Sequence, residues 1–162
     1  MASKSSNQVK PIPEGFHTVT PYFLVNDTDG YKSFLESALG AKEVECMSTP
    51  DGKIVHASME IGDSRIMFGD PMGNPPTRTM IYLYVNDVDS DYERAIGAGA
   101  KSVRPPNDEF YGDRSCCVED PEGNYWCISR HVEDVTREET ARRFGEMMKK
   151  APSADNPHLS EN

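Results

Sequence analysis

Two stretches of the chain show strand-like and helix-like patterns of hydrophobic residues in the same order. Residues 18–25 and 79–85 are rich in Thr, Val, Ile, Tyr and Phe, a composition typical of β-strands. Each run is followed by apolar residues spaced three and four apart, which predicts a helix with one buried face. The two faces consist of Tyr31, Phe34, Leu35 and Ala38, and of Val88, Tyr92, Ala95 and Ile96. Candidate caps and stops flank both helices, namely Asp27 or Asp29 with Gly40, and Asp87 or Asp89 with Gly97 or Gly99.

Three strand-like runs follow each predicted helix. The first set covers residues 42–48, 53–61 and 64–69, with turn signals at 50–52 and 62–63 between the runs. The second set covers about 101–104, 113–119 and 124–130, and its turn is Asp-Pro-Glu-Gly at 120–123. The pattern therefore predicts a βαβββ unit that occurs twice.

Short strings recur in the two units. Val-Asn-Asp-x-Asp occurs at residues 25–29 and again at 85–89, and Gly-Ala-Lys-x-Val occurs at 40–44 and 99–103. Ordered matches at nearly one offset indicate an internal duplication.

The duplication predicts the domain organisation. Modules over residues 15–70 and 78–131 belong to one domain that spans 15–135. Residues 136–150 predict a further helix, with Thr136 and Glu139 at capping-box spacing and Ala141, Phe144 and Met148 on one face. The polar segments 1–14 and 151–162 predict disordered tails.

Charge and composition limit the partners and the compartment. The 162 residues carry a formal net charge of −10, which repels nucleic acid and acidic membrane surfaces and makes both unlikely partners. No apolar run is long enough to span a bilayer, and the polar N-terminus does not resemble a signal peptide. The four cysteines match no zinc-binding or CxxC spacing, which favours reduced thiols in a cytoplasmic protein.

The second unit carries motifs of a known family. It contains Phe110-Tyr111-Gly112-Asp113-Arg114, then Asp120-Pro121-Glu122-Gly123-Asn124-Tyr125-Trp126, then His131-Val132-Glu133-Asp134-Val135. Together with the duplicated unit, this ordered set resembles the vicinal-oxygen-chelate superfamily of glyoxalases, bleomycin-resistance proteins and dioxygenases, and within it the PhnB-like branch. The resemblance covers residues 17–135. It implies an α+β fold in which two βαβββ modules form a curved mixed sheet around a cup, and it implies a homodimer.

The same resemblance implies four metal-ligand positions, in the first and last strand of each module. They correspond to Thr20, Met67, Met80 and Cys127. The superfamily's enzymes use His, Gln or Glu there, and Thr, two Met and one Cys are poor ligands for hard divalent ions. We therefore expect no metal and no other cofactor.

Strand alternation indicates which side chains line the cup. Ala57, Met59 and Ile61 should face the helices, so that His56, Ser58 and Glu60 face the cup or solvent. His56 is the candidate catalytic base, with a structural or surface histidine as the alternative. The candidate ligand-binding residues are Tyr22, Ser58, Met67, Met80, Tyr82, Tyr84, Tyr111, Asp113, Arg114 and Cys127.

These residue types suit a flat or apolar ligand, because tyrosine offers an apolar ring with a hydroxyl group and methionine adapts its shape. Packing in a core or subunit interface is the alternative for the tyrosines and methionines. An Asp113–Arg114 pair that holds its loop is the alternative for those two residues. Trp126 should point under the helix into the core.

Three functions are consistent with the sequence. The leading hypothesis is a metal-independent small-molecule binding protein, similar to the bleomycin-resistance relatives. The second is a lyase, isomerase or dioxygenase of the same superfamily, using a metal on ligands such as His17, His56 and Glu60, or His56 alone as a base. The third is an interaction module whose cup is filled by side chains. Whether the chain is an enzyme is left open.

Overall fold

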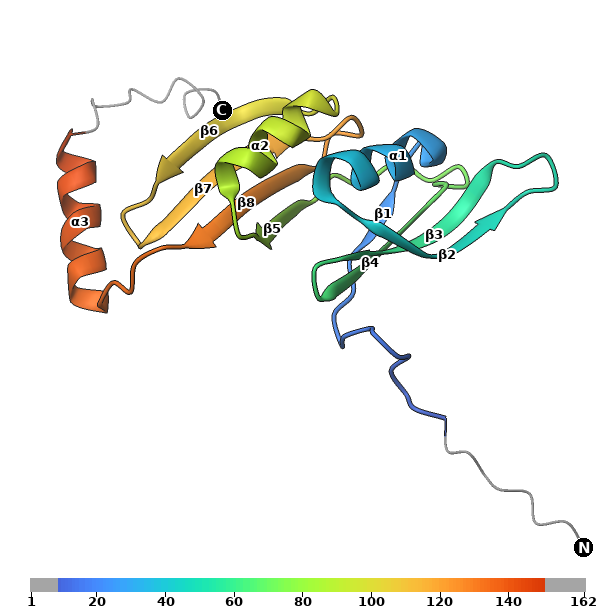
Figure 1. Ribbon diagram of the computed structural model, residues 1–162, viewed down its shortest axis with the longest axis horizontal. Helices are drawn as coiled ribbons and strands as arrows, with labels where there is room; N and C mark the ends of the chain where they lie inside the picture. The colour runs from blue at the N-terminus through green and yellow to red at the C-terminus, as the bar shows by residue number, and fades with distance from the viewer. Residues whose placement is uncertain (1–8, 151–162) are drawn as a thin grey trace, which may run out of the picture.

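The computed structural model describes residues 9–150 and contains two βαβββ modules followed by a helix (Figure 1). The first module consists of β1 (Tyr22–Leu24), α1 (Thr28–Leu39), β2 (Lys42–Ser48), β3 (Ile54–Ile61) and β4 (Ser64–Gly69). The second consists of β5 (Met80–Tyr84), α2 (Val88–Gly97), β6 (Lys101–Asp108), β7 (Asp113–Glu119) and β8 (Tyr125–His131), and α3 (Arg137–Lys150) follows. The predicted α+β fold of two repeated modules with a C-terminal helix is confirmed. The tail predicted at 151–162 and the first eight residues of the tail predicted at 1–14 lie outside the described residues.

Each module forms its own four-stranded mixed sheet. The strand orders are β1-β4-β3-β2 and β5-β8-β7-β6, in which β1–β4 and β5–β8 are parallel and the other pairs are antiparallel. Helices α1 and α2 contact each other and lie on the same side of the two sheets (Figure 1). Among the described residues, no helix or strand covers the opposite side, which we call the open face of each sheet.

The helix-facing side of the sheets forms the hydrophobic core. The apolar face predicted for α1 is buried, and so are Ala57, Met59 and Ile61 of β3, as strand alternation predicted. Asp27 caps α1 by accepting a hydrogen bond of 2.9 Å from the Gly30 amide. Trp126 is 1% exposed, which confirms its predicted place in the core.

Prolines explain two strand boundaries that differ from the predicted ones. β1 begins at Tyr22 rather than near residue 18, directly after Pro21, which has no amide hydrogen to donate. β6 continues to Asp108, so its predicted end at 104 was wrong. It passes through Pro105 and Pro106, where its register with β7 shifts. β6 is an edge strand, and an edge strand tolerates proline because one side of its backbone has no partner strand.

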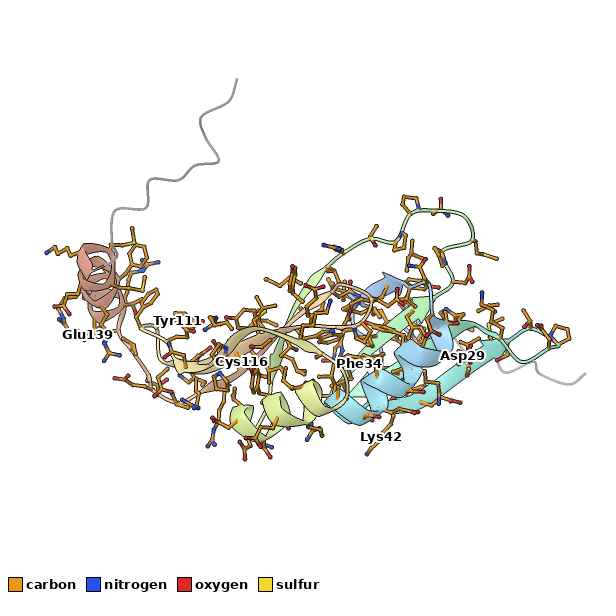
Figure 2. All side chains as sticks on the ribbon, turned by 90° about the horizontal axis from the view of Figure 1, so that it is seen from above. Asp29, Phe34, Lys42, Tyr111, Cys116 and Glu139 are labelled. Carbon is orange, nitrogen blue, oxygen red and sulfur yellow. The ribbon has the colours of Figure 1, made fainter. Side chains whose placement is uncertain are left out.

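The apolar faces predicted for α2 and α3 are only partly buried. Ile96 of α2 remains 36% exposed, although it falls on the predicted stripe. On α3, Phe144 packs against Phe110 with the ring centroids 5.4 Å apart, but Phe144 and Met148 remain 46% and 57% exposed. Helix α3 lies at the end of the second sheet, away from the first module (Figures 1 and 2), which explains why the core does not cover this face.

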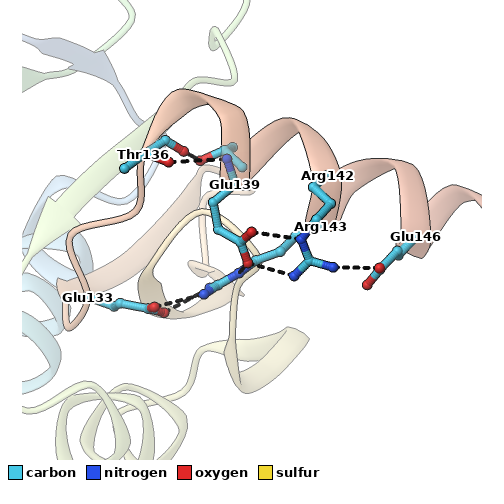
Figure 3. A network of polar contacts seen from close by, with 7 residues as sticks. Glu133, Thr136, Glu139, Arg142, Arg143 and Glu146 are labelled. Atoms are coloured by element: carbon cyan, nitrogen blue, oxygen red, sulfur yellow. Dashed lines mark hydrogen bonds and ion pairs between the residues drawn. The ribbon is translucent and has the colours of Figure 1, made fainter.

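Charged side chains hold α3 in place instead (Figure 3). Thr136 accepts a hydrogen bond of 3.2 Å from the Glu139 amide, which confirms the predicted cap. Arg143 pairs with Glu133, which precedes the helix, and with Glu139 in its first turn, at 2.8 Å and 2.7 Å. Arg142 forms a second pair with Glu139. The pairs with Glu139 lie within the helix, and the pair between Arg143 and Glu133 connects the helix to the segment after β8.

A buried carboxylate connects the two modules. Asp120, in the turn between β7 and β8, is 2% exposed. Its Oδ2 accepts hydrogen bonds of 3.0 Å from the Tyr31 hydroxyl of α1 and from the Trp126 indole nitrogen. Its Oδ1 accepts bonds from the backbone amides of Glu122 and Asn124 at 2.9 Å and 2.8 Å. Such a set satisfies a charge whose burial would otherwise be costly.

The same turn contacts the start of α1. The Glu122 carboxylate accepts hydrogen bonds from the backbone amides of Asn26 and Asp27, at 2.9 Å and 3.1 Å. At the other end of α1, the Arg94 side chain of α2 donates to the Ala38 carbonyl at 2.9 Å. Both ends of the first helix are thus held by the second module.

Replacing Asp120 by Asn should destabilise the whole domain. The amide keeps the volume but turns donor hydrogens toward the Tyr31 and Trp126 donors, so we expect a loss of about 2–4 kcal/mol of unfolding free energy. Chemical denaturation followed by Trp126 fluorescence measures it. Asp51→Asn, in the exposed β2–β3 turn, is the control and should change stability by less than about 0.5 kcal/mol. Equal stability of the two variants would contradict the role of Asp120.

Candidate functional site

The open face of the second sheet carries side chains in regular rows. The register aligns Tyr82, Cys127, Cys117 and Arg104 across β5, β8, β7 and β6. The next row along the strands consists of Tyr84, Ser129, Ser115 and Asn107. Each row therefore begins with a tyrosine at the β5 edge and continues through small side chains. This arrangement gives aromatic rings beside a floor of thiols and hydroxyls.

The β5 side chains of this face are accessible. Met80, Tyr82 and Tyr84 are 59%, 47% and 63% exposed, whereas Ile81 and Leu83 between them point to the core. The Tyr82 and Tyr84 rings lie 6.1 Å apart between centroids. The Tyr82 hydroxyl is hydrogen-bonded to the hydroxyl of Tyr111 at 2.9 Å, on the loop after β6. Three of the predicted tyrosines thus lie close together.

A buried carboxylate organises the polar end of this face. Asp113 is 5% exposed, and its Oδ2 accepts a hydrogen bond of 3.1 Å from the Tyr84 hydroxyl. Its Oδ1 lies 2.8 Å from Nδ1 of His131 at the end of β8, and Nε2 of the same ring lies 2.9 Å from Asp134. Hydrogen bonds to Asp113 and then to Asp134 raise the pKa of His131 above its usual range. The hydrogen bond to Asp113 also raises the pKa of Tyr84.

The open face of the first sheet carries the candidate base His56. The Tyr22 hydroxyl lies 3.0 Å from Nδ1 of His56, and the two rings stack with centroids 5.6 Å apart. Gly69, between them in the sheet, makes this contact possible, because a Cβ there would lie 2.5 Å from the Tyr22 hydroxyl oxygen. Met67 is paired with Tyr22 on one side and with Ser58 on the other, on the same face.

The candidate residues fall into two groups. Met80, Tyr82, Tyr84, Tyr111, Asp113 and Cys127 belong to the second sheet and its loop, and Tyr22, His56, Ser58 and Met67 belong to the first. Both open faces lie on the side opposite the helices (Figure 1).

Arg114 is the exception among the candidates. Its guanidinium binds Asp89 of α2 at 2.6 Å and Asp108 of β6 at 2.9 Å, on the helix side of the sheet. Its ion pairs therefore hold α2 and β6, and its partner is not Asp113.

Six further residues on the open face of the second sheet were not among the candidates, namely Arg104, Asn107, Ser115, Cys117, Ser129 and His131. Alternation along β8 from Cys127 would have identified Ser129 and His131, and alternation along β7 from Asp113 would have identified Ser115 and Cys117, whereas Arg104 and Asn107 follow only from the pairing of β6 with β7.

A cavity of about 880 Å³ adjoins this site at the junction of the modules. Apolar side chains from both modules line it, among them Leu39, Ile66, Leu83 and Trp126. Tyr82 and Tyr84 also line it, so the β5 edge connects the cavity to the tyrosines of the open face. The combined surface offers apolar area, aromatic rings and a few polar groups, as small-molecule sites do.

The donor set does not fit the metal used by enzymes of this fold. Within residues 9–150, no three or more His, Cys, Asp or Glu side chains are grouped so that they could hold an ion. The set formed by His17, His56 and Glu60 is therefore not assembled. Among the implied positions, Thr20 precedes β1 and its hydroxyl donates to the His17 carbonyl. The other three, Met67, Met80 and Cys127, offer only sulfur.

Within residues 9–150, no helix is long and apolar enough to cross a membrane.

The paired βαβββ modules and their open faces define a protein of the glyoxalase-like class. The family model of the Glyoxalase/Bleomycin resistance protein/Dioxygenase superfamily matches residues 15–128. The chain belongs to this superfamily.

Relatives and solved structures agree with this assignment. An uncharacterised protein of Mycobacterium bovis is 32% identical over 133 residues, which cover 75% of this chain and 88% of that protein. The crystal structure of TioX from Micromonospora sp. ML1 has a TM-score of 0.60 at 24% identity, covering 74% of this chain and all of that one. Lactoylglutathione lyase from Agrobacterium tumefaciens has a TM-score of 0.55 at 18% identity, over 75% and 96% of the two chains. At 24% and 18% identity, these two solved structures show that the chain has their fold.

His131 should titrate above its ordinary pKa of about 6.5, because Asp113 and Asp134 stabilise the charged ring. The resulting stabilisation is fully present below pH 6.5 and is lost as the pH rises through the folded-state pKa. An NMR titration of the histidine ring protons measures the midpoint. Asp113→Asn should lower it more than Asp134→Asn, because Asp134 is fully exposed. An unchanged midpoint in Asp113→Asn would show that Asp113 does not hold the ring.

Proposed function

We propose that this protein is a metal-independent binding protein for a flat or amphipathic small molecule, and that it belongs to the PhnB-like branch of the superfamily. The observation that carries the proposal is the cluster of accessible tyrosines at the β5 edge, beside the cavity at the module junction. The motif Asp120 to Trp126, which carries the resemblance to the branch, forms the β7–β8 turn and the start of β8, and its Asp120 bonds Tyr31 of the first module. The net charge of −10 favours such a ligand over nucleic acid, and four free cysteines favour the cytoplasm.

The geometry indicates the chemistry of the ligand. The rings of Tyr82 and Tyr84 present apolar surface, while their hydroxyl groups are already bonded to Tyr111 and Asp113. A flat ring can therefore pack on the tyrosines without leaving their hydroxyls unpaired. The hydroxyl of Ser129, which is paired with Tyr84 on the adjacent strand, is buried and has no partner among the described residues. A polar atom of the ligand that reached it would satisfy a group whose isolation costs about 1–3 kcal/mol.

We also propose that a second copy of the chain completes the site. The two open faces lie on the same side of the molecule, so neither covers the other (Figure 1). They expose large apolar side chains, namely Tyr22, Met47, Met80, Tyr82 and Tyr84, each more than 40% accessible. Apolar patches of this kind are commonly covered by a partner in soluble proteins. A two-fold dimer would place the open face of one copy over that of the other and enclose the ligand.

Truncation of Tyr82 should weaken ligand binding. A panel of flat aromatic and amphipathic compounds is screened by thermal shift, and the compounds that bind are titrated by calorimetry. Tyr82→Ala removes a ring worth roughly 1.5–3 kcal/mol when covered, so we expect the dissociation constant to rise about 10- to 100-fold. Tyr82→Phe should have a smaller effect because the ring remains.

The control for these variants is Tyr92→Phe. The Tyr92 hydroxyl bonds Ser102 at 2.7 Å, and Tyr92 lies on α2, so this variant removes a hydroxyl group away from the open face. Unchanged affinity in Tyr82→Ala would overturn the proposed site.

The wild-type protein is also analysed for Zn, Ni, Mn and Fe. About one metal ion per chain would favour a metal-dependent enzyme of the superfamily instead.

The mass in solution should be twice the chain mass of 18.1 kDa, as measured by light scattering after size exclusion. Met80→Asp places a charge in the proposed interface and should shift the protein toward the monomer. Val9→Asp, at a residue 89% exposed before the first module, is the control and should leave the mass unchanged. A wild-type mass of one chain would show that the open faces are not joined.

A further inference from the structure

We propose that Cys117 and Cys127 form a redox modification site, in which a small-molecule disulfide converts the two thiols into an intramolecular disulfide across β7 and β8. The two residues are directly opposite each other in the antiparallel pair. Their Sγ atoms lie 2.9 Å apart, and both are free cysteines. The inference concerns the second sheet alone and does not depend on the identity of a ligand.

The backbone already has the geometry that a disulfide requires. Directly opposite residues of an antiparallel pair have Cα atoms roughly 4.5–5.5 Å apart, within the range of about 4.4–6.8 Å that disulfides span. The bond can therefore form by small side-chain rotations, without moving the strands. Strand pairing brings these thiols together, because they are ten positions apart in the chain with a turn between them.

The other two cysteines cannot make an equivalent pair. Cys116 is adjacent to Cys117 but points to the opposite side of the sheet, where it is opposite Ile128 and fully buried under α2 (Figure 2). Cys46 belongs to β2 in the other module, where it is opposite Ala57. The pairing of strands therefore selects one pair out of four cysteines.

The position in the sheet gives the pair its chemistry. Cys127 is beside Tyr82 and Cys117 is beside Arg104, in the row that crosses the open face. Burial raises the pKa of the Cys117 thiol to about 12, and the positive charge of Arg104 acts in the opposite direction. The thiolate of Cys117 is therefore scarce at neutral pH, and its exchange proceeds faster in alkaline solution.

The reaction is a thiol–disulfide exchange with a reagent such as glutathione disulfide. One thiolate of the pair attacks a sulfur of the reagent and forms a mixed disulfide, and one glutathione thiolate leaves. The second protein thiol gives up its proton to solvent and attacks the protein sulfur of the mixed disulfide, which releases the second glutathione. Two protein sulfurs are oxidised and two glutathione sulfurs are reduced. The product replaces two thiols by a rigid bridge in the floor beside Tyr82.

The full-length protein is incubated with glutathione disulfide at pH 8.5, acid-quenched and denatured, and its free thiols are counted. We expect four thiols per chain to fall to two, with a mass decrease of two hydrogens, and dithiothreitol should reverse both changes. Cleavage after Glu119 and Glu122 should leave two peptides joined by the new bond. Tandem fragmentation between Cys116 and Cys117 identifies the sulfur involved, so the wild-type protein alone tests the assignment.

Two matched variants complete the test. Cys116→Ser should form the bridge as the wild type does, because its side chain faces away from Cys127. Cys117→Ser should fail to form it and should retain three thiols or carry a glutathione adduct. Four remaining thiols in the wild type, a stable glutathione adduct without a bridge, or a bridge to Cys116 or Cys46 would each overturn the proposal.

Discussion

The buried carboxylate of Asp120 is the interaction on which the arrangement of the two modules depends. A charge without water must be fully hydrogen-bonded, and Asp120 accepts bonds from two backbone amides, an indole and a hydroxyl. The hydroxyl belongs to Tyr31 of the first module, whereas the other donors belong to the second. The carboxylate can therefore be satisfied in full only when the modules are docked as observed. Burial and the bond to Asp120 raise the pKa of Tyr31, so this hydroxyl remains a donor.

This docking determines what the open faces can do. Because the second module holds both ends of α1, the two helices lie side by side and the two sheets expose their other side together (Figure 1). The tyrosines of β5 and the Tyr22–His56 pair are consequently accessible rather than packed in the core. The fold thus separates its tasks, since the helix side gives stability and the open side carries the candidate chemistry. Arg114 illustrates this division, because its ion pairs place it on the helix side.

Local pattern was enough to predict most elements of this fold. Hydrophobic period, turn residues and the repeated strings gave two βαβββ units, and strands such as Ser64–Gly69 and Asp113–Glu119 have the predicted bounds. The failures have local causes. Prolines displaced the ends of β1 and β6, because proline changes which backbone groups can pair without changing the hydrophobic pattern. Ile96 and Met148 fit an apolar stripe but meet no covering element among the described residues.

The recurring strings and motifs were enough to predict the repeat and the superfamily, and alternation along single strands was enough to predict the faces on which Tyr22, His56, Tyr82 and Tyr84 lie. The contacts between residues that are distant in the chain follow only from the way the strands and modules pack. Asp113 meets His131, Cys117 meets Cys127, and Asp120 meets Tyr31 across the module boundary. The hydrophobic period indicates which face each strand buries, but the exact register of β7 and β8 also depends on the geometry of their turn, and the docking of the modules depends on the packing of the whole core.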